Sequence, residues 1–296
     1  MKLQLCAAAL TITLIHCASS NLWATPFLYV SDYGANSISE ISADSTVSTF
    51  ATGMSGPSGL ALDDSGNLYV ANSGNNTISK ITPGGQVSIF ASGLSEPTGL
   101  AFDASGDLFV ANFGDGSISE FSTSGVSTFA TGLDQPQGLA FDASGDLYAA
   151  NEYTGTISRI TPGGAVSSFV TGLYEPTGLA FDKSGDLYVA SWDEGLISEI
   201  TPGRSVSNFA SSLDYPWGLA FDEAGNLYVS NYAAVSNSTV SEIGPGGSVS
   251  DFASGLIGPS FIVAAPVPEP LGLALVVPAI LALIRPRRQP PTNSSV

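Results

Sequence analysis

Histidine and cysteine are almost absent from this chain. The single histidine, His16, and the two cysteines, Cys6 and Cys17, all lie within the first 17 residues. The remainder of the chain therefore offers no disulfide, no zinc site built on His or Cys, and no histidine general base.

Positive charge is also scarce. The chain has 8 Lys and Arg against 26 Asp and Glu, and its formal net charge is -18. Nucleic-acid binding requires Lys and Arg against the phosphates, so this balance excludes a nucleic-acid partner.

The three rare residues lie in a segment that has the build of a secretory signal peptide. Lys2 precedes an apolar stretch over residues 5–15, and small and polar residues follow as far as Ala24. This order predicts a signal peptide over residues 1–24 and export of the chain. A lipoprotein signal ending at Cys17 is the alternative, although such signals place a small residue where His16 stands.

Most of the chain repeats one motif, P-x-G-L-A-[FL]-D. Its proline stands at Pro57, Pro97, Pro136, Pro176 and Pro216, at steps of 40, 39, 40 and 40 residues. A period of about 40 residues built from strand-like segments is typical of a β-propeller with one four-stranded blade per repeat.

Each repeat predicts four strands in a fixed order. The two that follow the proline are almost wholly apolar and the next two alternate apolar with polar residues, as in 117–121 and 126–129. Continuous apolar runs indicate strands covered on both faces, so the order runs from the channel outward as strands a, b, c and d. The turn Asp-x-(Ser/Ala)-Gly-(Asp/Asn) between a and b is typical of a tight hairpin.

The two ends of the repeat region complement each other. Residues 27–50 supply strands b, c and d without a strand a, and residues 259–264 form an isolated strand a. The sequence thus predicts an all-β, six-bladed β-propeller over residues 27–264, with four antiparallel strands per blade. The C-terminal inner strand would complete the N-terminal blade and remove open sheet edges.

The repeat P-x-G-L-A-F-D-x-S-G-D-L-Y-V-A-N, followed by I-S-x-I, resembles NHL-repeat propellers and the related SMP-30/gluconolactonase-like group. The resemblance implies a six-bladed fold. Because those groups include both binding platforms and enzymes, it does not decide the function.

The C-terminal region resembles a PEP-CTERM sorting signal. Val267, Pro268, Glu269 and Pro270 are followed by an apolar run over residues 271–284 and by Arg285, Arg287 and Arg288. The resemblance implies transient membrane insertion through residues 265–288, an exosortase-type processing enzyme as partner, and an exopolysaccharide-producing bacterium as host. Residues 289–296 form a polar tail, and an ordinary membrane anchor is the alternative.

One small polar residue ends strand b in every blade. These residues are Asp32, Asn72, Asn112, Asn151, Ser191 and Asn231. A ring of their oxygens at the channel mouth could hold Ca²⁺ or ordered waters. In the alternative interpretation each side chain caps its own strand and bonds nearby backbone.

A second candidate site lies where single blades depart from the repeat. The departures are Glu152 and Tyr153 after Asn151, the run Trp192, Asp193 and Glu194, and Trp217 at the x position of P-x-G. With Tyr33, Phe113, Tyr174 and Tyr215 they would give the mouth an aromatic and acidic character suited to stacking against sugars or peptides.

Two functions are consistent with these features. The sequence favours an exported, envelope- or matrix-associated protein that binds a polysaccharide, peptide or envelope protein without catalysis, and no cofactor is evident. The alternative is a metal-dependent hydrolase or lactonase, as the SMP-30/gluconolactonase resemblance implies, with Glu152, Asn151, Asp193 and Asn231 as candidate ligands.

Overall fold

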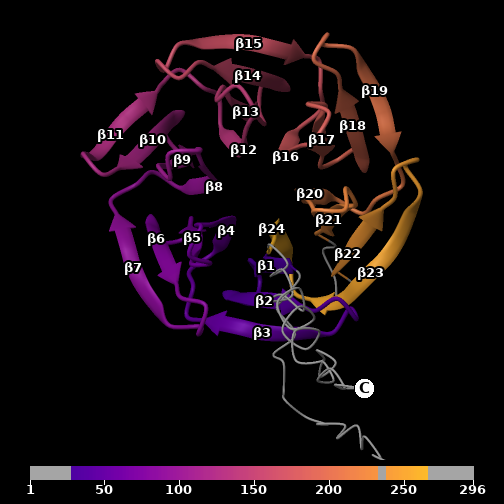
Figure 1. Cartoon of the computed structure of the whole chain (residues 1–296), viewed down its shortest axis with the longest axis horizontal. Helices are drawn as coiled ribbons and strands as arrows, with labels where there is room; N and C mark the ends of the chain where they lie inside the picture. Colours follow the sequence, from indigo (N-terminus) through magenta and orange to yellow (C-terminus); the bar gives the residue numbers. More distant parts are fainter. Residues whose placement is uncertain (1–27, 233–237, 266–296) are drawn as a thin grey trace, which may run out of the picture.

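The computed structural model describes residues 28–232 and 238–265, which form a closed ring of six blades around a central channel (Figure 1). The predicted signal peptide, the sorting signal at 266–288 and the polar tail lie outside the described residues. No helix in the described part of the chain is long and apolar enough to cross a membrane.

Each blade is a four-stranded antiparallel sheet, which confirms the predicted fold. The strands are β1 (Leu28–Asp32), β2 (Ser37–Ile41), β3 (Val47–Thr52), β4 (Pro57–Leu62), β5 (Leu68–Asn72), β6 (Thr77–Ile81), β7 (Val87–Ser92), β8 (Pro97–Phe102), β9 (Leu108–Asn112), β10 (Ser117–Ser122), β11 (Gly125–Ala130), β12 (Pro136–Phe141), β13 (Leu147–Asn151), β14 (Thr156–Ile160), β15 (Val166–Thr171), β16 (Pro176–Phe181), β17 (Leu187–Ser191), β18 (Leu196–Ile200), β19 (Val206–Ala210), β20 (Pro216–Phe221), β21 (Leu227–Asn231), β22 (Ser238–Ile243), β23 (Val249–Leu256) and β24 (Pro259–Ala264).

Blade I combines both ends of the propeller, in the order β24-β1-β2-β3. Strand β24 pairs antiparallel with β1, with Leu28 opposite Ala264 and Val30 opposite Ile262. Blades II to VI follow in sequence as β4–β7, β8–β11, β12–β15, β16–β19 and β20–β23. The inner strands β4, β8, β12, β16, β20 and β24 lie around the central axis of the ring (Figure 1).

An aromatic side chain on strand b joins neighbouring blades. Tyr188 of blade V meets Phe209 of its own strand d at 4.8 Å between ring centroids, and Phe221 of the next blade's strand a at 5.0 Å. Tyr148 makes the same pair of edge contacts with Phe169 and Phe181. These contacts stabilise the junctions between blades, beyond the apolar area they bury.

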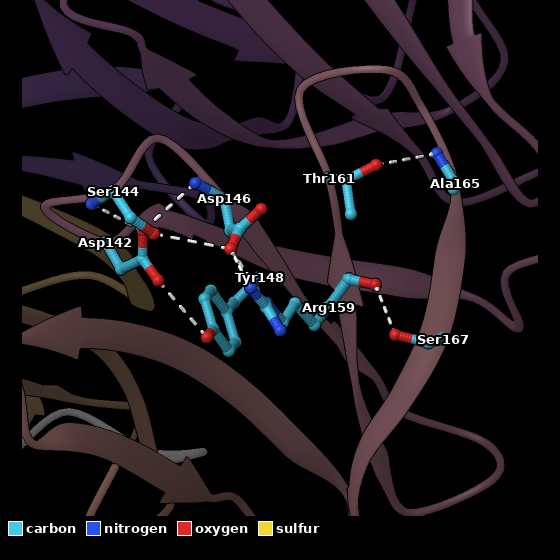
Figure 2. Close-up of polar contacts among 8 residues, drawn as sticks. All are labelled: Asp142, Ser144, Asp146, Tyr148, Arg159, Thr161, Ala165 and Ser167. Carbon is cyan, nitrogen blue, oxygen red and sulfur yellow. Dashed lines mark hydrogen bonds and ion pairs between the residues drawn. The ribbon is translucent and has the colours of Figure 1, made fainter.

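The a-to-b turn is closed by its first aspartate, as the turn chemistry predicts. In blade IV, Asp142 Oδ1 accepts the backbone N–H groups of Ser144 and Asp146 at 2.9 and 3.0 Å (Figure 2). Arg159 pairs with Asp146 beside it, and the Tyr148 hydroxyl donates to Asp142. The carboxylate oxygens of this turn therefore bond protein groups.

The glycine of P-x-G is required where inner strands approach each other. A Cβ atom on Gly138 would lie 2.3 Å from the carbonyl oxygen of Thr177 in the next blade, and one on Gly178 would lie 2.2 Å from that of Trp217. Real Cβ atoms do not approach backbone oxygens so closely, so the inner strands can lie this close together only because these positions lack a side chain.

Candidate ligand-binding site

A cavity of about 520 Å³ opens at the channel mouth, on the face formed by the b-to-c and d-to-a loops. The first residue after strand b enters it from every blade: Tyr33, Ser73, Phe113, Glu152, Trp192 and Tyr232. The x position of P-x-G contributes Ser58, Thr98, Gln137, Trp217 and Ser260, and Glu96 completes the lining. All six blades therefore contribute side chains to one pocket.

A repeated backbone hydrogen bond fixes the residues that follow strand b. Each of their N–H groups donates to the carbonyl of the residue before the strand-a proline of the same blade, at 2.9 to 3.3 Å. Trp192 N–H, for example, donates to Glu175 O, and Glu152 N–H to Gln135 O. The loops thus hold six side chains of five types on one common frame.

The residue before that proline has a left-handed backbone in each blade. Two blades use Gly56 and Gly258, whereas Glu96, Gln135, Glu175 and Tyr215 take φ values of 46°, 52°, 41° and 54°. A side chain in this region costs roughly 1–2 kcal/mol relative to glycine. Such strain at several positions around one mouth points to a role for the side chains themselves.

Four aromatic rings form an arc across blades V and VI. Trp192 lies 5.2 Å from Tyr215 and 5.9 Å from Trp217, and Trp217 lies 6.0 Å from Tyr232, between ring centroids. The indole Nε1 atoms of Trp192 and Trp217 are buried and have no hydrogen-bond partner in the described protein. The arc therefore combines apolar faces with two unpaired donors.

Acidic groups lie beside the arc. Glu152 accepts a hydrogen bond from Gln137 Nε2 at 2.5 Å. Burial raises the pKa of Glu175 above its ordinary value, and the charges of Asp193 and Glu152 raise it further. Glu175 therefore lies close enough to both Asp193 and Glu152 for their negative charges to oppose its ionisation.

The remaining predicted residues lie around this pocket. Tyr153 is 78% exposed and, with Glu175 and Glu152, lines an adjacent cavity of about 330 Å³ between blades IV and V. Asp193 and Glu194 are exposed, and Glu194 lines neither of these two cavities. The structure thus brings Glu152, Trp192 and Trp217 together in the pocket, whereas Tyr153 lines the adjacent cavity and Asp193 and Glu194 line neither.

The predicted ring of strand-b ends is buried, and the amide nitrogens of its four asparagines donate to strand c. Asn151 Nδ2 donates to Thr156 and to Ser158 of β14, and Asn72 makes the equivalent bonds with Thr77 and Ser79. Asn112 and Asn231 do the same in their blades. Ser191 is buried in the same place, and none of these residues lines the 520 Å³ pocket.

Asp32 replaces the asparagine in blade I. Its carboxylate accepts hydrogen bonds from Ser39 and from the backbone N–H of Ile257. Burial raises the pKa of Asp32 above its ordinary value, and these two hydrogen bonds partly offset that rise. The polar atoms of Asp32 therefore join strand c to the d-to-a loop.

Three of the four proposed metal ligands bond other protein groups in the structure. Asn151 and Asn231 donate to strand c, and Glu152 bonds Gln137. Within 28–232 and 238–265 no three His, Cys, Asp or Glu side chains gather in a geometry that could hold a metal ion.

Comparison with known proteins places the chain in a family. The model of the virginiamycin B lyase family matches residues 7–240. The chain belongs to this family. The NHL-like and gluconolactonase-like resemblance thus identified the architecture, whereas the matching family is the lyase group. No curated protein matches the chain.

Three solved structures show the same fold at low sequence identity. A catalytically inactive histidine-to-alanine variant of virginiamycin B lyase from Staphylococcus aureus, with quinupristin, is 16% identical with a TM-score of 0.61, over 79% of this chain and 86% of that one. A chain of a nidogen/laminin complex is 19% identical with a TM-score of 0.69, over 80% and 97%. A putative gluconolactonase is 16% identical with a TM-score of 0.63, over 74% and 84%.

Several pocket residues were missed by the sequence analysis. It recognised the x position of P-x-G only at Trp217, yet Gln137 and Thr98 occupy the same place in other blades. It also passed over Glu96 and Glu175, which precede the repeat proline. A usable signal was the variability of these positions inside an otherwise regular repeat.

Proposed function

We propose that this member of the virginiamycin B lyase family is an exported, envelope- or matrix-associated propeller that binds a ligand at its mouth without converting it. The 520 Å³ pocket carries the proposal, because all six blades line it and it contains unpaired buried polar atoms. Buried polar groups without a partner cost stability, and a bound ligand would satisfy them.

The residues of the pocket support binding over lyase chemistry. The Staphylococcus aureus relative is catalytically inactive when a histidine is replaced by alanine. The only histidine of this chain is His16, within the predicted signal peptide. The mouth provides carboxylates and indoles instead, which are groups suited to recognition.

The export and sorting part of the proposal rests on the two ends of the sequence. The signal peptide over residues 1–24 would direct export, and the motif at Val267, Pro268, Glu269 and Pro270 would be recognised by an exosortase-type enzyme. The chain would be anchored in the membrane through its C-terminal segment before processing.

A binding assay with product analysis tests the mouth. The full chain, Trp217→Ala and the outer-strand control Val126→Ala are mixed with soluble neutral, acidic and amine-bearing polysaccharides and with peptides. We expect retention of one class by wild type and Val126→Ala, loss in Trp217→Ala, and recovery of the ligand with unchanged mass. Cleavage or lactone hydrolysis that disappears in Trp217→Ala would establish an enzyme instead.

Sorting is tested by mass spectrometry of the protein recovered from an exosortase-containing host. We expect wild type to lose residues beyond the Pro-Glu-Pro motif and Glu269→Ala to retain them. An intact C-terminus in the wild type would support the ordinary membrane anchor.

A further inference from the structure

Both faces of the propeller are acidic, but the described basic side chains all lie away from the mouth. The mouth loops of the described residues carry no Lys or Arg and contain Glu96, Asp115, Asp134, Glu152, Glu175, Asp193, Glu194 and Asp214. The four described cations, Lys80, Arg159, Lys183 and Arg204, lie at the end of the blades where the a-to-b and c-to-d turns are. The field at the mouth therefore attracts cations.

Gln137, which lines the pocket, has an unused side-chain acceptor. The side chain is 5% exposed, and its Nε2 donates to Glu152. An ionised carboxylate only accepts hydrogen bonds, so this contact fixes which end of the amide faces Glu152. The Gln137 Oε1 atom is buried without a partner. A group that donates hydrogen bonds would satisfy it next to a negative charge.

The aromatic arc, in contrast, has donors that a hydrogen-bond acceptor on the ligand would satisfy. Trp192 Nε1 and Trp217 Nε1 are buried donors without acceptors, and their rings lie at 75° to each other. Two apolar faces and two N–H groups suit a ligand that has acceptor oxygens at the edge of a flat apolar surface.

We propose that the pocket binds an amino sugar that has a free, protonated amine. This inference rests on the proposed function, that the mouth is a ligand-binding site. The ammonium would lie between Glu152 and the Gln137 oxygen, the ring would stack on the arc, and the sugar hydroxyls would accept from the indoles. A lysine side chain has no acceptor beside its ammonium, so it would leave the indole donors unpaired.

Titration calorimetry with defined oligomers tests the proposal on the full chain. The probes are a glucosamine tetramer, the N-acetylglucosamine tetramer and tetralysine. We expect the glucosamine tetramer to bind at least tenfold more tightly than the other two, and its affinity to fall as salt is added. The acetylated tetramer is the matched control, because it keeps the ring and loses the charge.

Two variants separate the charge from the ring. Glu152→Gln should weaken the glucosamine tetramer about tenfold and leave the acetylated tetramer unchanged. Trp217→Phe, which keeps an aromatic ring without the N–H, should weaken both tetramers. Glu223→Gln, an acid on the opposite face, is the control and should change neither.

Four results would overturn the inference. Equal affinity for the two tetramers removes the requirement for an amine, and tighter binding of tetralysine assigns the mouth to basic peptides. If neither tetramer binds while another polymer is retained through Trp217, the amino-sugar assignment fails and the proposed binding function stands. If no polymer or peptide is retained, both fail.

Discussion

Replacing Gly138 by alanine should test whether the close approach of inner strands sets the stability of the ring. Gly138 belongs to β12, and its added Cβ would lie 2.3 Å from Thr177 O in β16. The strands would have to separate by about 0.7 Å to reach the 3.0 Å below which real Cβ atoms are not seen. The obstacle is backbone, so no rotamer change relieves it.

Gly138→Ala should lower the free energy of unfolding by about 3 kcal/mol, the upper end of the usual range for overpacked cores. The loss should be this large because a closed ring cannot relax at one junction between blades without moving the others. In a domain of this size a loss of about 3 kcal/mol lowers Tm by roughly 6–12 °C. The change in Tm is measured by thermal unfolding followed by circular dichroism. The control in the same blade is Gly163→Ala, where the nearest atom to a Cβ is 4.0 Å away. Equal Tm values for the two variants would refute the argument.

Three further predictions concern the blade junctions and the mouth. Tyr188→Ala removes the ring between blades V and VI and should lower the unfolding free energy by about 3–5 kcal/mol in urea titrations. Glu96→Gly removes the strain of a left-handed backbone and should raise the free energy of unfolding by about 1 kcal/mol. The same change removes a negative charge from the mouth and should weaken the binding of a cationic ligand. A lower Tm than that of the wild type would contradict the first expectation. Burial, aided by Asp193 and Glu152, raises the pKa of Glu175 above 4.5, so its ionisation opposes folding. This destabilisation is absent at pH values below the pKa that Glu175 has in the unfolded chain, and it is complete at pH values above the raised pKa of the folded protein. Glu175→Gln should therefore raise Tm near pH 7 and leave it unchanged near pH 4, as measured by thermal unfolding.

The architecture could be predicted because the repeat has a constant length and its turns have a recognisable sequence. The spacing of Pro57, Pro97 and the later prolines gives the blades, and residues 259–264 complete the first one. Both features can be recognised from the order of segments along the sequence, and each has one structural explanation. The left-handed backbone before the proline was not predicted, because Glu, Gln and Tyr give no glycine signal there.

The site was predicted in part, because a wholly apolar inner strand hides which residues face the channel. Gln137 lies in a run whose neighbours are buried on both faces, so no alternation marks its direction. At the end of strand b, a shift of one residue decides whether a side chain faces strand c or the pocket. Asn151 faces strand c and Glu152, the next residue, faces the pocket, since successive side chains leave a strand on opposite sides.

Comparison of the six blades within this one chain separates the frame from the site. At the end of strand b, four blades have Asn and the others Asp and Ser, and most of these side chains make the same bonds to strand c. One residue later the backbone bond is again the same in every blade, but the side chains are Tyr33, Ser73, Phe113, Glu152, Trp192 and Tyr232. A position whose backbone is held identically while its side chain differs in nearly every copy is free of a shared packing role. Its side chains are therefore available for recognition, and a ligand that contacts several blades would meet a different group from each.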